Sequence, residues 1–226
     1  MTNAVWIIMY ELQRARAAEY LGWFHDVHIP EKLARPGYDW ASHYRILHDG
    51  DDASAEDGDM ACVALFGGRA TSVFYNPSPA QLKPTQSAET RDMMTCRKNS
   101  RSLILSGEWA VDGHGAANES KPAIDAEVIA VAFCDVAGND EDFGAWLAQV
   151  HLESIARDRG CIGVRKFLAS TGGAKHAIFQ ERSDIAAPPL AFADTGNDEW
   201  TARVREYVSH PLGAPKTARR LWHARS

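Results

Sequence analysis

Apolar residues follow two similar patterns along the chain, one in each half. An apolar run over 5–10 is followed by a helical pattern over about 15–35, in which aromatic and aliphatic residues recur every three or four positions. A second apolar run begins at Val128, and a second helical pattern covers about 140–159. Each half is therefore predicted to begin with a strand and a helix that covers one face of a sheet.

The two patterns align without a gap when the sequence is displaced by 123 positions, the separation between His28 and His151. The alignment extends over about forty residues and also pairs aromatic residues of different types, such as Tyr20 and Phe143. Identical residues coincide at several positions: Trp23 with Trp146, Val27 with Val150, His28 with His151 and Gly37 with Gly160. A repeat of this length indicates that one structural unit occurs twice.

Each half continues with a strand hairpin, a second helix and a final strand. These elements are predicted at 42–47, 62–66, 87–96 and 102–111 in the first half, and at 165–169, 176–180, 198–209 and 218–224 in the second. Gly37 and Gly160 follow the first helix of each half, where a glycine in the left-handed conformation commonly ends a helix. The order of elements is βαββαβ in both halves.

The predicted fold class is α+β, with two ferredoxin-like βαββαβ repeats whose antiparallel sheets pack into one intramolecular α/β barrel. The first repeat covers 1–111, a linker rich in Gly, Ala and Asn covers 112–126, and the second repeat covers 127–226. A sheet with helices on one face needs a partner for its other face, and the second repeat supplies that partner. We expect an enclosed cavity between the two sheets to be the ligand site.

Composition and charge narrow the classes of partner. The chain has 24 Lys and Arg against 30 Asp and Glu, and no basic cluster is interleaved with aromatic residues, which argues against a nucleic-acid partner. The run over 5–10 is too short to span a membrane and lacks the features of a signal peptide, so we expect a cytoplasmic protein. The four cysteines form no C-x-x-C pair and are expected to be buried and unreactive.

Residues 23–31 read Trp-Phe-His-Asp-Val-His-Ile-Pro-Glu, and they precede Pro36-Gly37-Tyr38 and then Tyr44-Arg45. This order resembles the dimeric α/β-barrel proteins of the EthD-like group, whose members are usually homodimers of one ferredoxin-like unit. The resemblance implies that the dimer is fused here into a monomer with an intramolecular pseudo-dimer, with further self-association left open. The second half departs from the motif: Ala148, Glu153 and Arg159 replace His25, Pro30 and Pro36.

His28 is the leading candidate for acid-base chemistry. Pro30 lacks a backbone N–H, which frees the carbonyl of Asp26, so we expect a helix kink that turns His28 inward. An imidazole titrates near neutral pH and can take a proton from a substrate and return it. His151 occupies the matching position and is the second catalytic candidate. The alternative is that both histidines are buried framework residues.

The strand after the helix carries further candidates. Tyr44 is predicted to polarise a carbonyl or to orient His28, although Phe167 at the matching position indicates that an aromatic ring there can serve packing alone. Side chains alternate along a strand, so Tyr44 and His43 cannot face the same side. The residues predicted to bind substrate are Trp6, Tyr10, Trp40, His43 and Arg45.

A metal site has little support in the sequence. His25 and His28 are three residues apart on one helix, a spacing that can hold a metal ion, but no recognisable ligand set completes the site. We therefore predict no metal and no cofactor, and a His25 side chain that faces solvent.

The sequence predicts a cofactor-independent, lyase-type enzyme. His28 would serve as acid and base in a dehydration, an elimination or a rearrangement. The substrate would be small, largely apolar and aromatic. The resemblance leaves the reaction open, because the superfamily includes polyketide cyclases, dehydratases, cofactor-free monooxygenases and haem proteins. The alternatives are thus a cofactor-free monooxygenase of phenolic, polyketide-like substrates, a haem protein with an axial histidine, and a ligand-binding barrel without catalysis.

Overall fold

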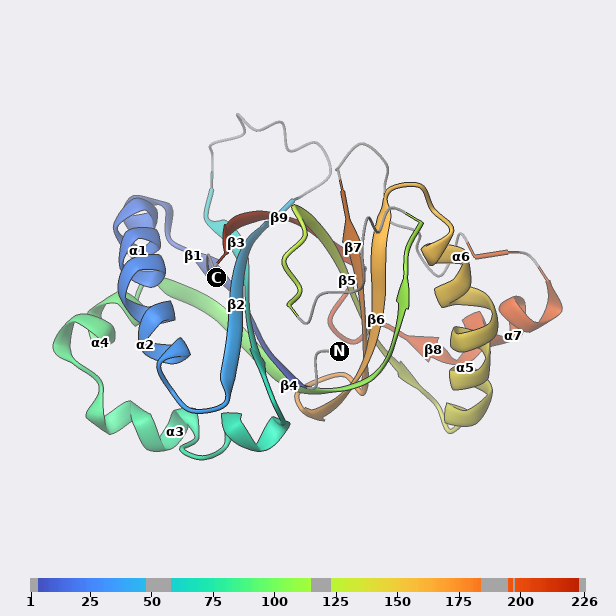
Figure 1. Ribbon diagram of the computed structural model, residues 1–226, viewed down its shortest axis with the longest axis horizontal. Coiled ribbons are helices and arrows are strands. Elements are labelled where there is room, and N and C mark those ends of the chain that lie inside the picture. Colours follow the sequence, from blue (N-terminus) through green and yellow to red (C-terminus); the bar gives the residue numbers. More distant parts are fainter. Residues whose placement is uncertain (1–3, 48–57, 115–122, 184–194, 197, 224–226) are drawn as a thin grey trace.

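A computed structural model shows a closed β-barrel with helices on two opposite sides of it (Figure 1). The structure describes residues 4–47, 58–114, 123–183, 195–196 and 198–223. In the part of the chain that is described, no helix is long and apolar enough to cross a membrane.

Eight antiparallel strands form the barrel. They are β1 (Ala4–Leu12), β2 (Tyr38–Ile46), β3 (Met60–Gly68), β4 (Arg97–Asp112), β5 (Val128–Val136), β6 (Cys161–Thr171), β7 (His176–Arg182) and β9 (Lys216–His223). Around the barrel the order is β1, β3, β2, β9, β5, β7, β6 and β4, and β4 pairs with β1 again. A short strand, β8 (Val208–Ser209), pairs antiparallel with the last residues of β5. Each predicted strand is present, and most extend beyond their predicted bounds.

The two halves of the barrel have the same strand order. The first half reads β4-β1-β3-β2 and the second reads β9-β5-β7-β6. They join at two antiparallel seams, β2 with β9 and β6 with β4, so the second strand of each half meets the fourth strand of the other. This is the arrangement of two copies related by a two-fold axis. The barrel is thus one hydrogen-bonded sheet closed on itself, which confirms the expectation that the sheets of the two halves form one α/β barrel.

The first helical region has the same course in both halves. Its segments are α1 (Ala17–Trp23), η2 (Phe24–His28) and α2 (Ile29–Leu33) in the first half, and α5 (Asp140–Trp146), η5 (Leu147–His151) and α6 (Leu152–Ala156) in the second. Every one of these bounds differs by 123 residues between the halves, as Ala17 and Asp140 do. The displacement found in the sequence therefore also relates the two helical regions in space.

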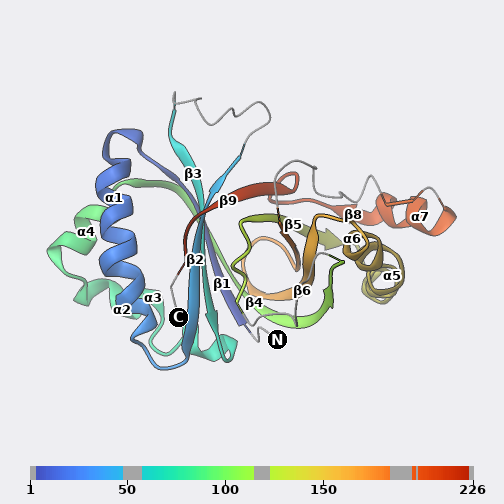
Figure 2. The ribbon, with the colours of Figure 1, turned by 45° about the horizontal axis from the view of Figure 1, so that its top comes forward.

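Shorter helices complete the two helical layers. They are α3 (Pro79–Leu82) and α4 (Ala88–Met94) in the first half and α7 (Glu199–Tyr207) in the second, with 3-10 turns at Arg14–Arg16, Thr71–Phe74 and Lys83–Thr85. Helices α1 to α4 lie on one side of the barrel and α5 to α7 on the other (Figure 2). Ser87 caps α4 and Asp198 caps α7, each by accepting a backbone hydrogen bond.

The segments η2 and η5 are π-helical turns, so the helical region is irregular at His28, where the sequence predicts a kink. Pro30 lies in the first turn of α2, just after the π-helical turn. The second half has Glu153 at the matching position and still forms η5. The turn is thus a property of both helical regions and does not depend on proline, and π-helical turns are frequent at functional sites.

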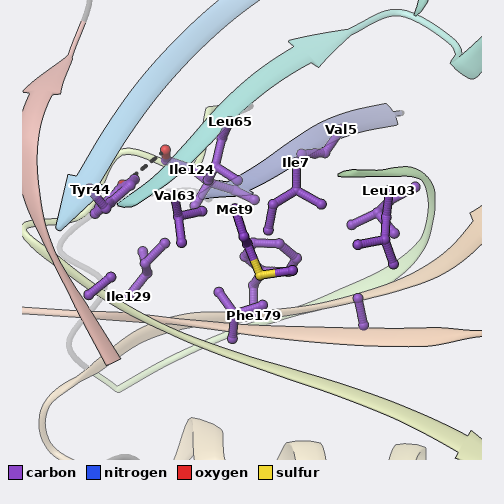
Figure 3. Close-up of a cluster of buried hydrophobic side chains, with 14 of the residues drawn as sticks. Val5, Ile7, Met9, Tyr44, Val63, Leu65, Leu103, Ile124, Ile129 and Phe179 are labelled. Atoms are coloured by element: carbon purple, nitrogen blue, oxygen red, sulfur yellow. Dashed lines mark hydrogen bonds between the residues drawn. The ribbon is translucent and has the colours of Figure 1, made fainter. Parts of the chain in front are cut away.

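Apolar side chains fill the barrel interior (Figure 3). Val5, Ile7 and Met9 point inward from β1 and belong to one buried cluster with Leu65 and Phe179. The even-numbered residues of β1 point outward and contribute to a separate cluster beneath the first helices. Among the described residues, inward-pointing side chains of both halves therefore form a packed core in the space where a ligand cavity is expected.

The end of the predicted linker belongs to this core. Ile124 is fully buried, and its carbonyl accepts hydrogen bonds from the hydroxyls of Ser42 and Tyr44, at 2.8 and 3.2 Å. The Tyr44 hydroxyl is also 3.2 Å from the carbonyl of Ala126. This end of the predicted linker, 123–126, therefore packs against strand β2. Residues 115–122 lie outside the described ranges.

The two glycines that follow the first helices differ. Gly37 has a φ of 91°, which confirms the predicted left-handed conformation, and a Cβ there would lie 2.5 Å from Val73 Cγ1. It lies in the turn before β2, because α2 already ends at Leu33. Gly160 does not have a positive φ, so the same expectation is wrong for it. Its small size is needed instead because a Cβ would lie 2.7 Å from Nη2 of the buried Arg182.

The four cysteines are free and buried, as predicted. Burial raises the pKa of Cys62 and of Cys134 to about 12. Thiols with such high pKa values are poor nucleophiles at neutral pH.

Candidate functional site

A pocket of about 580 Å³ lies between α2 and the outer wall of the barrel in the first half. Its floor comes from β1 and the first part of β4, and the segment 79–94 with α3 and α4 forms the opposite wall. Five of its lining residues are apolar: Trp6, Ile8, Pro79, Leu82 and Met94. This size and this apolar surface suit a ligand with two or three aromatic rings.

Basic side chains dominate the polar part of the pocket. The charged residues that line it are Lys32, Arg35, Arg97, Arg101 and a single acid, Glu31. His28 also lines it. His28, Lys32 and Arg35 share one side of the helical region because they are spaced four and three residues apart. The lining is therefore electropositive and favours an anionic ligand.

His28 is a neutral base at the edge of this electropositive pocket. Only 6% of the residue is exposed, and its ring lies 4.7 Å from that of Trp23 and 5.5 Å from that of Phe24. Burial, followed by the charges of Lys32 and Arg97, lowers the pKa of His28 to about 2. Its buried Nδ1 has no hydrogen-bond partner. The imidazole is therefore unprotonated at neutral pH.

Lys32 is buried without a counter-ion. It is 7% exposed, and its Nζ lies 5.2 Å from the centroid of the Trp6 ring, within the range of a cation–π interaction. In the part of the chain that is described, no carboxylate forms an ion pair with it. Burial and the neighbouring Arg35 and Arg97 lower the pKa of Lys32 to about 8. The pocket therefore holds an ammonium group that is only weakly stabilised.

Replacing Lys32 by methionine is expected to stabilise the protein by about 1–3 kcal/mol at pH 7, because the unpaired charge is removed and the apolar stem is kept. The pKa of Lys32 is about 8 in the folded protein and 10.5 ordinarily, so the unfolded chain binds more protons between these values and the stability of the natural protein rises with pH there. The variant should lack that rise. Urea denaturation at pH 7 and at pH 10 measures both effects.

Lys98→Met is the matched control, because the exposed Lys98 already pairs with Asp59 at 2.8 Å. It should change the free energy of unfolding by less than about 1 kcal/mol. Equal stability of Lys32→Met and the natural protein at pH 7 would contradict the assignment of Lys32 as an uncompensated buried charge.

A chain of hydrogen bonds leads away from the pocket at Arg97. The Nε of Arg97 donates to the Tyr20 hydroxyl at 2.5 Å, and that hydroxyl donates to the Tyr10 hydroxyl at 3.2 Å. The Tyr10 hydroxyl lies 2.9 Å from Nε2 of His43, whose Nδ1 lies 2.8 Å from Nε2 of His25. Buried polar groups thus connect the pocket to His25, which is half-buried.

The sequence-predicted residues separate into three groups. His28 and Trp6 line the pocket. Tyr10 and His43 lie behind it in the hydrogen-bonded chain. The prediction of a solvent-facing His25 is wrong, because its ring is hydrogen-bonded to that of His43 and stacks on Trp222 with the ring centroids 5.7 Å apart.

The third group points elsewhere. Tyr44 and Trp40 lie in the barrel core, on the opposite side of β2 from His43, which confirms that His43 and Tyr44 do not share a face. Arg45 is half-buried and alternates with Tyr44 on β2. Neither Tyr44 nor Trp40 contributes to the pocket, since inward-pointing side chains cannot reach the outer wall of the barrel.

His151, the counterpart of His28, is enclosed in the second helical layer. It is 1% exposed, its Nδ1 lies 2.5 Å from Oγ1 of Thr195, and its ring stacks on Trp146 at 5.0 Å. Burial lowers the pKa of His151 to about 3. This geometry fits the alternative of a framework histidine.

Sequence reasoning missed the cations of the pocket. Lys32 and Arg35 carried a usable signal, because they follow His28 at helical spacing. Arg97 carried no such signal, because it is 77 residues away in the sequence from Tyr20, its hydrogen-bond partner.

The site does not have the features of a metal or haem centre. The described residues contain no group of three or more His, Cys, Asp or Glu that could hold a metal ion. A histidine that binds haem iron normally donates its second ring N–H to an acceptor, which fixes the ring. The Nδ1 of His28 is buried without such an acceptor, so His28 does not fit the role of an axial ligand.

Comparison by sequence finds no matching protein-family model and no matching curated protein. Comparison by structure finds several similar folds. A proposed monooxygenase from Fusobacterium nucleatum has a TM-score of 0.60 at 12% identity, over 100% of this chain and 95% of that one. An anthrone oxidase-like protein has a TM-score of 0.57 at 12% identity, over 99% and 93%.

A proposed chlorite dismutase has a TM-score of 0.51 at 12% identity, over 97% of this chain and 95% of that one. At such low identities the likeness concerns the fold and not the activity. The chain therefore shares an α/β-barrel fold with these proteins.

Proposed function

We propose that the pocket is the active site of a cofactor-independent monooxygenase that acts on a phenolic or enolisable aromatic compound. The observation that carries the proposal is a neutral, buried base, His28, in a pocket with an aromatic wall and an excess of positive charge. Such a pocket stabilises a substrate anion, and an electron-rich anion can itself react with oxygen.

The substrate is first converted to its anion. Trp6 packs against an aromatic ring, and His28 accepts a proton from an acidic C–H or O–H group. The negative charge left on the substrate oxygen lies near Lys32, where the low dielectric of the pocket strengthens the attraction. The same negative charge offsets the cations around His28 and raises the pKa of its imidazole, which makes the proton transfer easier.

Oxygen then acts as the oxidant. An activated CH2 group loses one proton to His28, and the resulting carbanion transfers an electron to O2 and combines with it to form a carbon-bound peroxide anion. This anion takes the proton back from His28 and becomes a hydroperoxide. His28 then removes the second C–H proton as the O–O bond breaks, which leaves a C=O group, and the departing hydroxide takes up that proton to form water. One oxygen atom enters the product and the other enters water, and the four electrons lost by the carbon are those gained by O2.

A lyase reaction is the second candidate, and one observation favours it. The ammonium of Lys32 has a pKa of about 8, so it can return a proton to a leaving hydroxyl after His28 has removed one from carbon. The two reactions share the first step and differ in whether oxygen is consumed.

Oxygen uptake tests the proposal. The purified protein is incubated with hydroxylated two- and three-ring aromatic ketones in an oxygen electrode, and the products are identified by mass spectrometry. We expect one O2 consumed per product, no turnover without oxygen, and no visible absorption band in the protein. Turnover at the same rate without oxygen would overturn the monooxygenase reaction and favour the lyase.

We also infer that the chain is a fused pair of ferredoxin-like repeats, covering 1–111 and 127–226, related to the EthD-like group. The matching helix bounds, strand orders and seams of the two halves support this inference. Because the barrel closes within one chain, we expect a monomer in solution.

A further inference from the structure

We propose that the ligand of this pocket carries a carboxylate that binds Arg97, in addition to the reactive aromatic group. The inference rests on the proposed function and names the substrate class more closely. It follows from the charge of the pocket, from the surroundings of Arg97, and from a difference between the two halves of the chain.

The pocket holds more positive charge than one substrate anion would balance. Lys32, Arg35 and Arg97 lie close enough together that the two arginines lower the pKa of Lys32. An enolate or phenolate near His28 supplies a single negative charge, and Glu31 is the only acidic residue in the lining. A second, permanent negative charge on the ligand would balance the remaining cations.

Arg97 has neutral partners only. Its guanidinium carbon lies 4.2 Å from the centroid of the Tyr10 ring and 5.1 Å from that of Phe24, and its Nε donates to the Tyr20 hydroxyl. Its Nη2 is buried without a hydrogen-bond partner. Among the described residues no carboxylate forms an ion pair with it. A guanidinium placed in this way is stabilised by an anionic ligand, and carboxylates match its planar donors.

The hydrogen-bonded chain fixes Arg97 in one orientation. Tyr20 accepts from Arg97 and donates to Tyr10, so Tyr10 in turn donates to Nε2 of His43. Nδ1 of His43 then carries the proton and donates to His25. Burial lowers the pKa of both histidines, which keeps them neutral and preserves this direction of donation. Four residues thus act as positioning groups for one guanidinium.

The second half shows that the Tyr20 hydroxyl is not needed for packing. The displacement of 123 residues places Phe143 where the first half has Tyr20, and Phe143 is buried in the corresponding helical layer. The comparison does not extend to Tyr10, because Tyr10 points outward from the barrel whereas Phe133 points into its interior. A buried hydroxyl costs free energy unless it is hydrogen-bonded, so a tyrosine at position 20, in the half that contains the pocket, indicates a role other than folding.

Binding of 2-naphthoate and of its neutral isostere 2-naphthamide, measured by isothermal titration calorimetry, tests the inference. We expect naphthoate to bind the natural protein at least tenfold more tightly than the amide, which corresponds to about 1.4 kcal/mol. Arg97→Gln should remove this preference and leave naphthamide binding unchanged. Tyr20→Phe should weaken naphthoate binding about threefold to tenfold through loss of orientation, again without an effect on the amide.

Arg101→Gln is the matched control, because it removes the same charge from an exposed position at the rim of the pocket. It should weaken naphthoate binding less than threefold. Equal affinities for naphthoate and naphthamide, or equal losses in Arg97→Gln and Arg101→Gln, would overturn the inference. Oxygen uptake with an uncharged phenolic substrate by the same preparation would show that the proposed function survives such a result.

Discussion

Replacing His28 by alanine is expected to lower kcat/KM by roughly 10²–10⁴-fold, the usual contribution of a positioned base. The effect should be large because His28 is the neutral base in the pocket lining, and Lys32 and the arginines beside it are cations that cannot accept a proton when charged. The measurement is the initial rate of oxygen uptake, or of product formation without oxygen. Because His28 is neutral at neutral pH, it should cause no inflection of kcat/KM near pH 6.5.

His151→Ala provides the matched control for this prediction. It removes the same side chain from the same helical position, at a site packed against Trp146 and Thr195. The variant should lose stability but retain kcat/KM within about threefold in its folded form, because we place no substrate beside His151. A similar loss of activity in both variants, with both still folded, would contradict the assignment of the chemistry to the first half.

The pH dependence of activity should instead report Lys32. Its pKa is about 8, so the ammonium that stabilises the substrate anion is present below this value and is lost as the pH rises through it. Lys32→Met should remove that inflection.

Much of the fold could be predicted from the sequence because its signals are local. The helical spacing of residues such as Tyr20 and Trp23 fixes a helix that covers a sheet, and the alternation along β2 correctly separates His43 from Tyr44. The displacement of 123 residues predicted equal helical regions, and the structure has them with equal bounds. These signals depend on residues near one another in the chain.

The location of the site could not be predicted in the same way. Alternation shows that two residues face opposite sides of a strand, but it does not show which side faces a ligand. The expectation of a site in the barrel interior therefore rested on the predicted architecture alone. Large aromatics such as Trp40 and Tyr44 pointed to the interior, where they prove to be core. The pocket depends on Arg97 and on the segment 79–94, which the fold brings to His28 from far along the chain.

Replacing Phe179 by alanine is expected to destabilise the protein by about 3–5 kcal/mol, a large part of the 5–15 kcal/mol typical of a folded domain. Phe179 is fully buried in the barrel core, and its ring packs edge-on against Phe167 at 5.3 Å. The strands of the closed barrel surround the interior on all sides, so the core cannot collapse to fill the space left by the benzyl group. Urea denaturation measures the loss, and Tyr75→Ala, which removes an exposed ring, is the control.

The same variant distinguishes the two possible locations of the site. Under conditions in which Phe179→Ala remains folded, it should bind naphthoate and consume oxygen like the natural protein, because the barrel wall separates its core position from the pocket beneath α2. If the ligand instead bound in the interior, the space left by the Phe179 ring would enlarge the site and change the affinity or specificity for substrate. If folded Phe179→Ala protein has an altered ligand affinity, the site lies in the interior of the barrel. If its affinity is unchanged, the interior serves stability and the outer wall carries the chemistry.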